Sequence, residues 1–518
     1  MSEPTGLWTI AEAEPDRVAV VEPDGTEISY GELTSRANRY GRGFQALGLA
    51  PGDTVVVLLP NSAELLAVFF AALQTGLYFV PVNWHLVGPE INYVIADSGA
   101  KVFVAHERFA EAARAAVEGD PVPEEARFAV GEIDGFRPLA ELGAGEPAGR
   151  PDDRVLGSPM LYTSGTTGRP KGVRRPLTGE PVDEVPARNR LFFALFDLRP
   201  HEGHVHLCGS PLYHAAVLSC AVVSVLYGHP VVLMDGWDAE QMLRLIERHR
   251  VTHSHVVPTQ FHRLLALPAE TRAKYDLSSL RKLVHGAAPC PQETKRRMID
   301  WLGPVIVEYY AATEGGGAVI DSAQWLAKPG SVGLPWPGSQ VRVLDEQGAE
   351  VPAGQPGLVY LQAGAVTTFE YHGDPEKTAA NRVGELFTMG DIGYLDADGY
   401  LFLCDRRNDM IISGGVNIYP AEIEGELAVH PKVADVAVFG IPHPDWGEEV
   451  KAVVQPAEGV VGDAALTEEL LAWAGTRLAK FKLPRSIDYL DSLPRDPNGK
   501  LYKRRLREPY WAGRARNI

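Results

Sequence analysis

Cysteine is scarce in this chain, and its few cysteines follow no metal-binding or disulfide spacing. Only 4 of the 518 residues are cysteine, and Cys208, Cys220, Cys290 and Cys404 stand apart without a CxxC pair. Neither a disulfide framework nor a cysteine zinc site is therefore indicated. The pattern is typical of reduced thiols, and we expect a cytoplasmic protein.

Long apolar runs of the membrane-spanning kind are also lacking. The longest apolar stretch, residues 65–82, is interrupted by Gln74 and Gly76 and has Pro81 near its end. This pattern predicts a buried helix followed by a strand. The acidic start, MSEPTGLWTIAEAEPD, has no basic segment followed by an apolar core, so the sequence predicts neither a signal peptide nor a transmembrane segment.

Positive charge is in deficit. The chain has 49 Lys and Arg against 67 Asp and Glu, a formal net charge of −18. This balance argues against nonspecific binding to nucleic acid. Any polyanionic substrate must instead meet Lys and Arg side chains that are concentrated locally. The basic segment after residue 500 leaves open a weak peripheral contact with a membrane, and a homodimer is left open as well.

The pattern along the chain predicts an α/β fold of at least two domains. Strands and helices alternate from residue 54 onward, most regularly over residues 230–309, which indicates a mostly parallel sheet with helices on both faces. From residue 340 short strands and turns predict a β-rich subdomain. Past residue 405 the sequence predicts a small α+β domain, so we place an N-terminal domain at residues 1–405 and a C-terminal domain at residues 406–518.

The segment LYTSGTTGRPKGV, residues 161–173, has the composition of a phosphate-binding loop. Glycines let backbone N–H groups approach phosphate oxygens, hydroxyls add donors, and a lysine supplies a point charge. The segment is not a Walker A motif, because no Gly-Lys-Ser/Thr ends it. The candidate phosphate-binding residues are Thr163, Ser164, Gly165, Thr166, Thr167, Gly168 and Lys171.

A second cluster, EYYAATEG, begins at Glu308 and follows a predicted strand. An aromatic ring such as that of Tyr310 can stack on a purine. Thr313 can donate to a phosphate, and Glu314 offers carboxylate oxygen, the ligand type that Mg²⁺ prefers. Together with the preceding loop, the cluster predicts a nucleotide site with Glu314 as its magnesium ligand.

These two segments, with four more in the same order, resemble the adenylate-forming (ANL) superfamily. The other four are His285–Pro289, FTMGDIGY around Asp391, DRRNDMIISGGVNIYPAEIE at 405–424, and LPRDPNGK ending at Lys500. The resemblance covers nearly the whole chain. It is strongest with the bacterial fatty-acyl-CoA synthetases, the acyl-CoA ligase branch that includes relatives acting on bulky carboxylates.

The resemblance implies a role for individual residues. It assigns the catalytic residues, the acyl pocket, the hinge and the CoA contacts as follows: catalysis to Lys500, Glu314, Thr313 and His214; the acyl pocket to His214 and Ala311; the hinge to Asn408; and CoA to Ser413, Gly414, Gly415 and Lys482. It assigns the nucleotide contacts beyond the phosphate loop to Gly286, Ala287, Ala288, Glu308, Tyr309, Tyr310, Ala311, Thr313, Asp391 and Arg406.

The activity implied by the resemblance is that of an AMP-forming acyl-CoA ligase using ATP, Mg²⁺ and coenzyme A. A carboxylate, from a fatty acid or another bulky apolar acid, attacks the α-phosphate of ATP and gives an acyl-adenylate and pyrophosphate. Lys500 neutralises charge in this step. The small domain then rotates about the hinge, and the CoA thiol displaces AMP.

Several alternatives stay open or are set aside. A stand-alone adenylating enzyme could load a carrier protein or pass the activated group to another acceptor, as diazotising and aryl-acid-activating members do. A fatty-acyl-AMP ligase is less favoured, because no insertion is evident after the β-rich subdomain. A catalytically dead nucleotide-binding protein is less favoured, because so many convergent charges are retained. The run His201–His206 resembles a metal cluster superficially but is better explained as structural. His253 and His255, on one short predicted strand, are also better explained as structural histidines.

Overall fold

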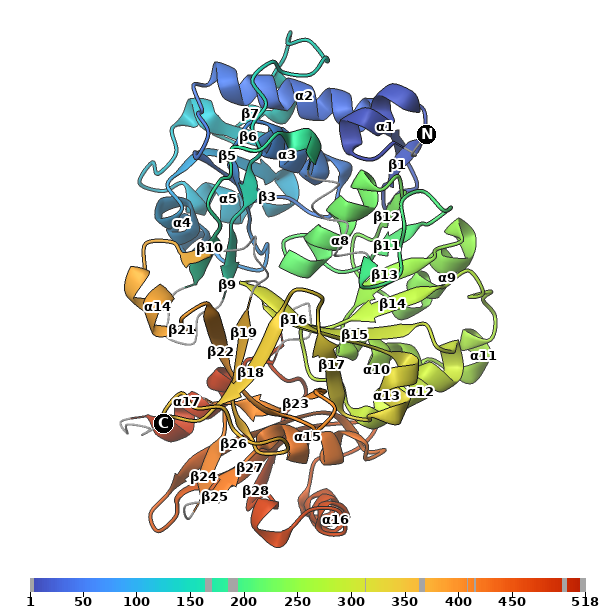
Figure 1. The fold of residues 1–518 in the computed structure, drawn as a ribbon, viewed down its shortest axis with the longest axis vertical. Helices are drawn as coiled ribbons and strands as arrows, with labels where there is room; N and C mark the ends of the chain where they lie inside the picture. The colour runs from blue at the N-terminus through green and yellow to red at the C-terminus, as the bar shows by residue number, and fades with distance from the viewer. Residues whose placement is uncertain are drawn as a thin grey trace. The chain divides into compact units, whose positions relative to one another are not determined.

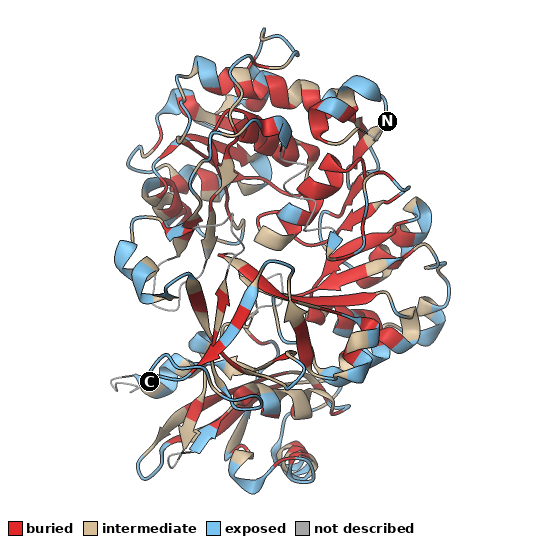
Figure 2. Ribbon diagram, in the orientation of Figure 1, coloured by how far each residue is buried: buried red, intermediate tan, exposed pale blue. Residues whose placement is uncertain are grey.

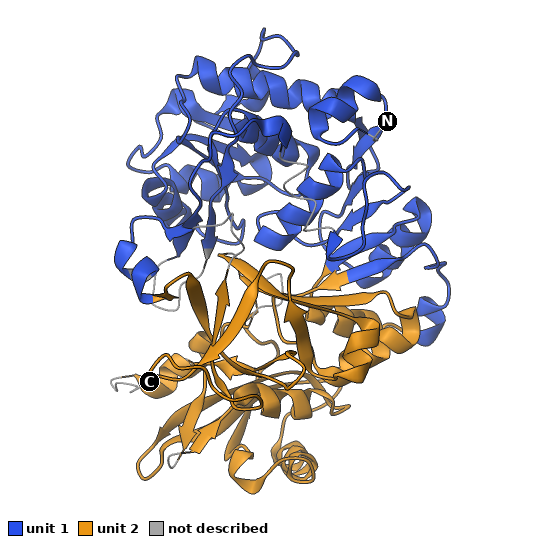
Figure 3. Ribbon diagram, in the orientation of Figure 1, with its two compact units in different colours: residues 1–255, 269–283, 366–380 blue, residues 256–268, 284–365, 381–518 orange. Residues whose placement is uncertain are grey.

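The computed structural model describes most of the chain, namely residues 4–163, 170–184, 194–312, 314–362, 369–407, 409–413, 416–495 and 501–512. The chain divides into two compact units (Figure 3). Unit 1 comprises residues 1–255, 269–283 and 366–380. Unit 2 comprises residues 256–268, 284–365 and 381–518.

Unit 1 contains a six-stranded parallel sheet in the order β7-β6-β5-β3-β4-β8. Its strands are rich in Val, Ala and Phe, as expected where helices cover both faces of a parallel sheet. The bounds are β3 Thr54–Leu58, β4 Tyr78–Pro81, β5 Ala100–His106, β6 Arg127–Val130, β7 Arg137–Pro138 and β8 Ser158–Pro159.

A second group of strands in unit 1 has the order β2-β1-β12-β11-β13, parallel except for the β1–β2 hairpin (Figure 1). The bounds are β1 Val18–Val21, β2 Glu27–Ser29, β11 His206–Cys208, β12 Val231–Leu233 and β13 His253–Val256. A third, three-stranded sheet has the order β20-β10-β9, with β9 Leu161–Thr163, β10 Lys171–Arg174 and β20 Glu370–Tyr371.

The helices of unit 1 follow the strands closely in sequence. Helix α3, Ala63–Gln74, is apolar on every side and buried nearly throughout (Figure 2). Helix α2 starts with a capping box between Ser29 and Glu32, which satisfies two orphan N–H groups. The remaining helices are α1 Leu7–Ala13, α2 Tyr30–Ala46, α4 Gly88–Asp97, α5 Ala110–Ala116, α8 Ala215–Leu226, α9 Ala239–His249, α11 Ala269–Arg272 and α14 Pro375–Ala380.

Unit 2 contains an antiparallel sheet in the order β15-β16-β17-β23-β22-β19-β18. Its bounds are β15 Ile306–Ala312, β16 Gly315–Asp321, β17 Ser331–Pro335, β18 Gln340–Leu344, β19 Gly357–Gln362, β22 Leu386–Leu395 and β23 Leu401–Arg406, with β21 Arg382–Val383 beside β22. Strand β14, Lys282–His285, crosses the unit boundary, and the helices of this part are α10 Pro258–Ala266, α12 Gln292–Leu302 and α13 Ser322–Ala327.

The last hundred residues of unit 2 form a sheet in the order β25-β24-β27-β26, with β28 parallel to β27. Helices α15 and α16 pack on this sheet around Ile423, Leu427 and Leu470. The bounds are β24 Ile411–Ser413, β25 Val416–Ile418, α15 Pro420–Ala428, β26 Val433–His443, β27 Gly447–Pro456, α16 Ala464–Gly475, β28 Ser486–Tyr489 and α17 Lys503–Trp511.

The predicted fold class is confirmed: the fold is α/β, with a large sheet-rich N-terminal part, a β-rich subdomain and a smaller C-terminal α+β part. The domain boundary at residues 405 and 406 stays a prediction. No helix among the described residues has both the length and the apolar character needed to cross a bilayer.

Candidate active site

The predicted phosphate loop is flanked by two paired strands of unit 1. Strands β9 and β10 are antiparallel, with Lys171 opposite Thr163. The ammonium of Lys171 lies 3.9 Å from a carboxylate oxygen of Asp374, at the limit of an ion pair, and its side chain is 25% exposed. A weakly held, partly exposed ammonium of this kind can meet a phosphate group.

Helix α4 holds the flanks of this hairpin in place. The hydroxyl of Tyr162 donates to Asp97 over 2.7 Å, and that of Tyr93 donates to the Pro170 carbonyl over 3.1 Å. Burial, followed by the adjacent Asp97 carboxylate, raises the pKa of Tyr162. Tyr162 therefore stays a protonated donor, and both ends of the hairpin are attached to the same helix.

The predicted acyl-pocket residue His214 also lies in unit 1, immediately before α8. Its ring centroid is 4.2 Å from that of Tyr213, and Tyr213 packs edge-on against Trp84 at 4.8 Å. Trp84 in turn stacks on Phe109. His214 therefore borders an aromatic cluster, formed by Trp84, Phe109 and Tyr213, that the sequence did not predict.

In unit 2 the predicted adenine turn packs tightly on β15. A Cβ placed on Gly286 would lie 2.7 Å from the ring of Tyr309 and 2.8 Å from its carbonyl oxygen, so only glycine fits there. The next residue, Ala287, has φ of +67°, a conformation that is uncommon outside glycine. The turn is thus both closely packed and strained.

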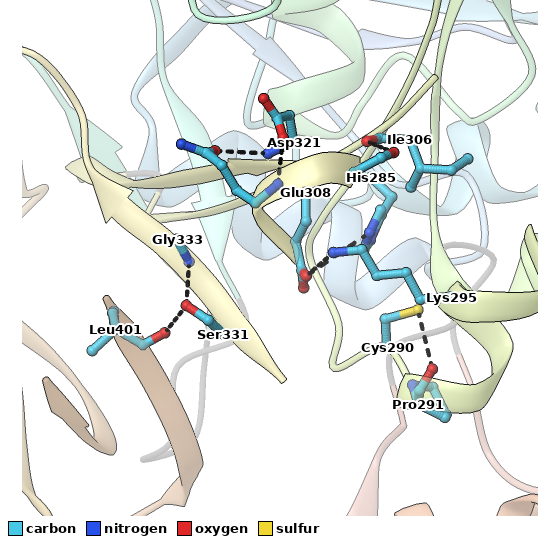
Figure 4. Close-up of polar contacts among 12 residues, drawn as sticks. His285, Cys290, Pro291, Lys295, Ile306, Glu308, Asp321, Ser331, Gly333 and Leu401 are labelled. Carbon is cyan, nitrogen blue, oxygen red and sulfur yellow. Dashed lines mark hydrogen bonds and ion pairs between the residues drawn. The ribbon is translucent and has the colours of Figure 1, made fainter. Parts of the chain in front are cut away.

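Next to this turn lies a buried charge cluster of His285, Lys295 and Glu308, of which the sequence indicated His285 and Glu308 (Figure 4). The Glu308 carboxylate accepts from the Lys295 ammonium over 2.5 Å and lies 4.0 Å from Nε2 of His285. Lys295 and His285 are fully buried, and Glu308 is 7% exposed. Burial raises the pKa of Glu308, and Lys295 opposes that rise. The role of Glu308 as a direct nucleotide contact stays a prediction.

A second polar cluster in unit 2 joins β15 to strands β22 and β23. The hydroxyl of Tyr310 donates to one oxygen of Asp391 over 2.6 Å. The other Asp391 oxygen lies 3.4 Å from Nε of Arg406, which is opposite Asp391 in the strand register. Burial, followed by Asp391, raises the pKa of Tyr310 well above its usual value, so its hydroxyl remains a donor.

Two other predicted residues lie on β15 or directly after it. Ala311 is half-buried on β15, and Glu314, 7% exposed, comes just after that strand. The negative charge of Glu314 acts on Tyr310 and contributes to the raised pKa of that phenol. Structure thus brings Tyr310, Glu314, Asp391 and Arg406 into one neighbourhood.

The C-terminal part of unit 2 holds a pocket beside the predicted CoA residues. Ser413 lines it together with Trp446, Phe481 and Arg485. Trp446 is 39% exposed and Phe481 50% exposed, which is unusual for large aromatic side chains. The guanidinium carbon of Arg485 lies 4.5 Å from the Trp446 ring centroid.

Lys482, adjacent in sequence to this pocket, is engaged by a carboxylate in this structure. Its ammonium donates to both oxygens of Glu422, each over 2.6 Å. The remaining predicted site residues lie outside the described residues, namely Ser164, Gly165, Thr166, Thr167, Gly168, Thr313, Asn408, Gly414, Gly415 and Lys500.

The sequence did not indicate several residues of the candidate site: Lys295 beside Glu308, the aromatic cluster beside His214, and Trp446, Phe481 and Arg485 at the pocket. For Lys295 a signal existed, because it is three and four residues before the buried Met298 and Ile299 and so shares their helix face. For Trp446 and Phe481, which are 35 positions apart in sequence, no local pattern indicates that they line one pocket.

Comparison with known proteins is consistent over the whole chain. Residues 7–369 match the family described as AMP-binding enzyme, and residues 422–500 match its C-terminal domain. A feruloyl-CoA synthase of Amycolatopsis sp is 38% identical over 98% of this chain and 99% of that protein. The fatty acid–[acyl-carrier-protein] ligase ScoC of Streptomyces coeruleorubidus is 34% identical over 98% of this chain and 96% of that protein.

Among solved structures, ATP-bound MatB from Rhodopseudomonas palustris superposes with a TM-score of 0.81 and 32% identity. The match covers 96% of each chain.

Proposed function

Because this chain belongs to the AMP-binding enzyme family, we propose that it is an ATP-dependent acid–thiol ligase that converts a carboxylic acid first to its acyl-adenylate and then to its CoA thioester. Two half-reactions are involved. In the first, a carboxylate oxygen attacks the α-phosphorus of ATP and pyrophosphate leaves. In the second, the CoA sulfur attacks the acyl carbonyl and AMP leaves.

The observation that carries the first half-reaction is the cluster of Tyr310, Asp391 and Arg406. A carboxylate fixed by a phenol on one oxygen and a guanidinium near the other is aimed in one direction. Such a carboxylate can accept hydrogen bonds from the two adjacent ribose hydroxyls. A freely rotating, solvated carboxylate would lack the fixed orientation, and a neutralised one would lack the negative charge. Tyr310 then offers its ring to the adenine.

The donor set near this cluster is compatible with Mg²⁺. Glu314 supplies a carboxylate, and among the described residues no group of three or more His, Cys, Asp or Glu is arranged to hold a metal ion. Mg²⁺ commonly keeps several waters and takes one or two carboxylates together with substrate phosphates, so a single glutamate suits it. When bound, the ion would neutralise developing charge on the phosphates. Lys171 and, in the first half-reaction, Lys500 are proposed to add positive charge there.

The second half-reaction is supported by the pocket of unit 2, whose lining combines aromatic rings, the Arg485 guanidinium and the Glu449 carboxylate. Coenzyme A carries an adenine and phosphate groups. The exposed ring of Phe481 can stack on a purine, and Arg485 can pair with a phosphate. The Trp446 ring is already covered by Arg485 and by the stacked His443 ring. Ser413, with Gly414 and Gly415 after it, is proposed to border the pantetheine chain. Lys482 would exchange Glu422 for a CoA phosphate.

For the acid, we propose a fatty or bulky aromatic carboxylate, in keeping with the substrates named for the two relatives. His214, beside the Trp84–Phe109–Tyr213 cluster, and Ala311 are proposed to border this substrate. A second candidate acceptor is a carrier protein, which the name of ScoC favours. Cytoplasmic location, a homodimer and weak contact with a membrane surface stay predictions.

The decisive experiment measures pyrophosphate release from ATP with a panel of fatty, aromatic and steroid carboxylates, with and without CoA. Thioester formation is followed by mass spectrometry. We expect one substrate class to release pyrophosphate and to yield a CoA thioester. Pyrophosphate without thioester would move the acceptor to a carrier protein or another nucleophile. No release with any acid, under conditions where Lys500→Ala behaves identically, would overturn the ligase assignment.

A variant of the pocket tests the CoA part separately. We expect Arg485→Ala to raise the KM for CoA about tenfold, because a charge-assisted contact to a phosphate is lost, while acid-dependent ATP–pyrophosphate exchange is retained. Arg477→Ala is the matched control, since Arg477 lies over Trp473 in the same part of the chain and outside the pocket. An unchanged KM for CoA in Arg485→Ala would place the acceptor site elsewhere.

A further inference from the structure

Lys295 is a buried cation whose position is hard to explain by stability alone. It is fully buried, its ammonium is 2.5 Å from Glu308, and it lies 4.9 Å from the ring centroid of the buried Trp325. Replacing a buried ion pair by well-packed apolar side chains is often neutral or stabilising. Stability alone therefore does not explain a lysine at this position, and a function is the alternative explanation.

The ion pair adjoins the two segments that are proposed to bind the nucleotide, namely the turn at Gly286 and strand β15. Glu308 is next to Tyr309, against which Gly286 packs, and two residues before Tyr310, which holds Asp391. Figure 4 shows the Lys295 side chain reaching from α12 to Glu308, with His285 beside them. His285 is the residue that leads directly into the strained turn at Gly286 and Ala287.

The strained conformation of that turn needs support from the residues around it, and the ion pair is one such support. Ala287 holds a positive φ of 67°, and a non-glycine residue keeps such a conformation only where its surroundings over-determine it. On one side Gly286 is pressed against Tyr309. On the other, His285 is held between the Phe261 ring, edge-on at 5.0 Å, and the Glu308 carboxylate at 4.0 Å.

We propose that Lys295 is a positioning residue for the adenine nucleotide: its ion pair with Glu308 fixes His285 and β15 so that the turn Gly286–Ala288 keeps the conformation that receives the base. Lys295 itself touches neither substrate. This inference rests on the proposed function, because it concerns the nucleotide of the same reaction. It adds a residue on α12 that no motif of the sequence indicated.

The test separates positioning from simple destabilisation. We expect Lys295→Met to raise the KM for ATP about tenfold in acid-dependent ATP–pyrophosphate exchange, with kcat changed by less than about threefold. The KM for pyrophosphate, which has no adenine, should not change. A merely structural lysine would give the opposite pattern, since a partly unfolded population lowers kcat and leaves every KM as it was.

Three further variants make the outcome interpretable. Lys295→Arg keeps the charge and should restore most of the ATP affinity. The double variant Lys295→Met/Glu308→Leu replaces the pair by apolar side chains and should fold with near-parental stability while its KM for ATP stays high. Arg297→Met is the matched control, because Arg297 is an exposed cation on the same helix, and it should leave the KM for ATP unchanged.

The results that overturn the inference are distinct from those that overturn the ligase assignment. If Lys295→Met, or the double variant where the single one does not fold, has the parental KM for ATP, Lys295 has no positioning role. If the parental protein shows no exchange with any acid, the ligase assignment fails instead. The role of Lys295 can then still be tested by measuring AMP binding with calorimetry. We expect the dissociation constant for AMP to be about tenfold larger in Lys295→Met.

Discussion

Asp391 is held by two side chains that come from different strands and do different things for it. Tyr310 donates a short hydrogen bond of 2.6 Å, and Arg406 supplies a positive charge at 3.4 Å from the other oxygen. The longer contact leaves that oxygen open to a further donor. The residue therefore combines a fixed orientation with a free acceptor position, which is what recognition of a ribose diol requires.

At this scale, removing one hydroxyl tests the arrangement. We expect Tyr310→Phe to raise the KM for ATP about tenfold, because a hydrogen bond to a charged group contributes about 1.5–3 kcal/mol and its loss lets Asp391 turn. The measurement is ATP–pyrophosphate exchange at varied ATP. Tyr394→Phe is the control, since Tyr394 stacks on Phe402 on the same pair of strands. Equal KM values in the two variants would contradict the role given to Tyr310.

The same residues show how much of the candidate site could be predicted from the sequence. Tyr310, Asp391 and Arg406 were all predicted, because each lies in a motif whose local composition is informative. That the phenol of Tyr310 donates to Asp391, 81 positions away, could not be predicted, since it depends on how β15 and β22 are placed by the strands between them. The ion pair of Lys295 with Glu308 depends likewise on the packing of α12 against the sheet.

Among the elements, the residues that flank the segment 496–500 are joined to each other. Arg495 and Leu501 form an isolated antiparallel bridge, and the N–H of Tyr502 donates to the Pro494 carbonyl over 2.8 Å. Arg495 also makes a bidentate pair with Asp435 on β26, at 2.5 and 2.7 Å. A bidentate guanidinium–carboxylate pair fixes direction as well as distance. Arg495 and Leu501, on either side of residues 496–500, are thus tied to β26.

Loosening that anchor should affect one half-reaction selectively. We expect Asp435→Asn to slow adenylation about tenfold, because the ends of the Lys500 segment lose their fixed attachment, and to leave transfer from preformed acyl-adenylate to CoA unchanged. Rapid-quench measurement of each half-reaction checks this. Glu469→Gln, which removes the exposed partner of Lys432 in the same part of the chain, is the control. Equal slowing of both steps would indicate a general loss of folded protein.

The elements themselves were predicted well where one periodicity dominates. Helix α9 and strand β13 lie in the region 230–309, where the sequence predicted regular alternation of strands and helices, and α9 has a strong 3.6-residue apolar period. Helix α16 ends at Gly475, and Leu478, three residues later, still packs in the core. Two-residue strands such as β7 and β8 carry no period at all.

On the scale of a whole unit, the interior of unit 1 is notable for its buried histidines. His206, His229, His253 and His255 are each less than 5% exposed. Nδ1 of His206 pairs with the Ser224 hydroxyl at 2.7 Å, and the same hydroxyl lies 3.2 Å from His253. Burial lowers the pKa of His206 and of His229 to about 3 and that of His255 to about 4. In the folded protein these rings are therefore neutral at pH 7.

These lowered pKa values predict how stability depends on pH. An unfolded histidine takes up a proton below about pH 6.5, whereas the folded rings do so only near pH 3 to 4. The unfolded chain therefore binds more protons within that window, and each such histidine lowers the free energy of unfolding by about 1.4 kcal/mol per pH unit as the pH falls through it. Their full contribution is present above about pH 7. Urea unfolding at pH values from 7.5 to 5 measures the slope.

One substitution assigns part of that slope to the buried rings. Buried carboxyls such as Glu308 and Glu424, whose pKa values are raised by burial, act in the opposite sense and reduce the total slope. Comparing variants with the parent cancels that contribution. We expect His206→Asn to lower stability at pH 7.5 but to flatten the slope between pH 6 and 5 by about one histidine's share. His85→Gln, at an exposed position, should leave the slope unchanged. If His206→Asn and the parent lose stability in parallel as the pH falls, His206 is not neutral in the folded chain, and the acid sensitivity of unit 1 must arise elsewhere.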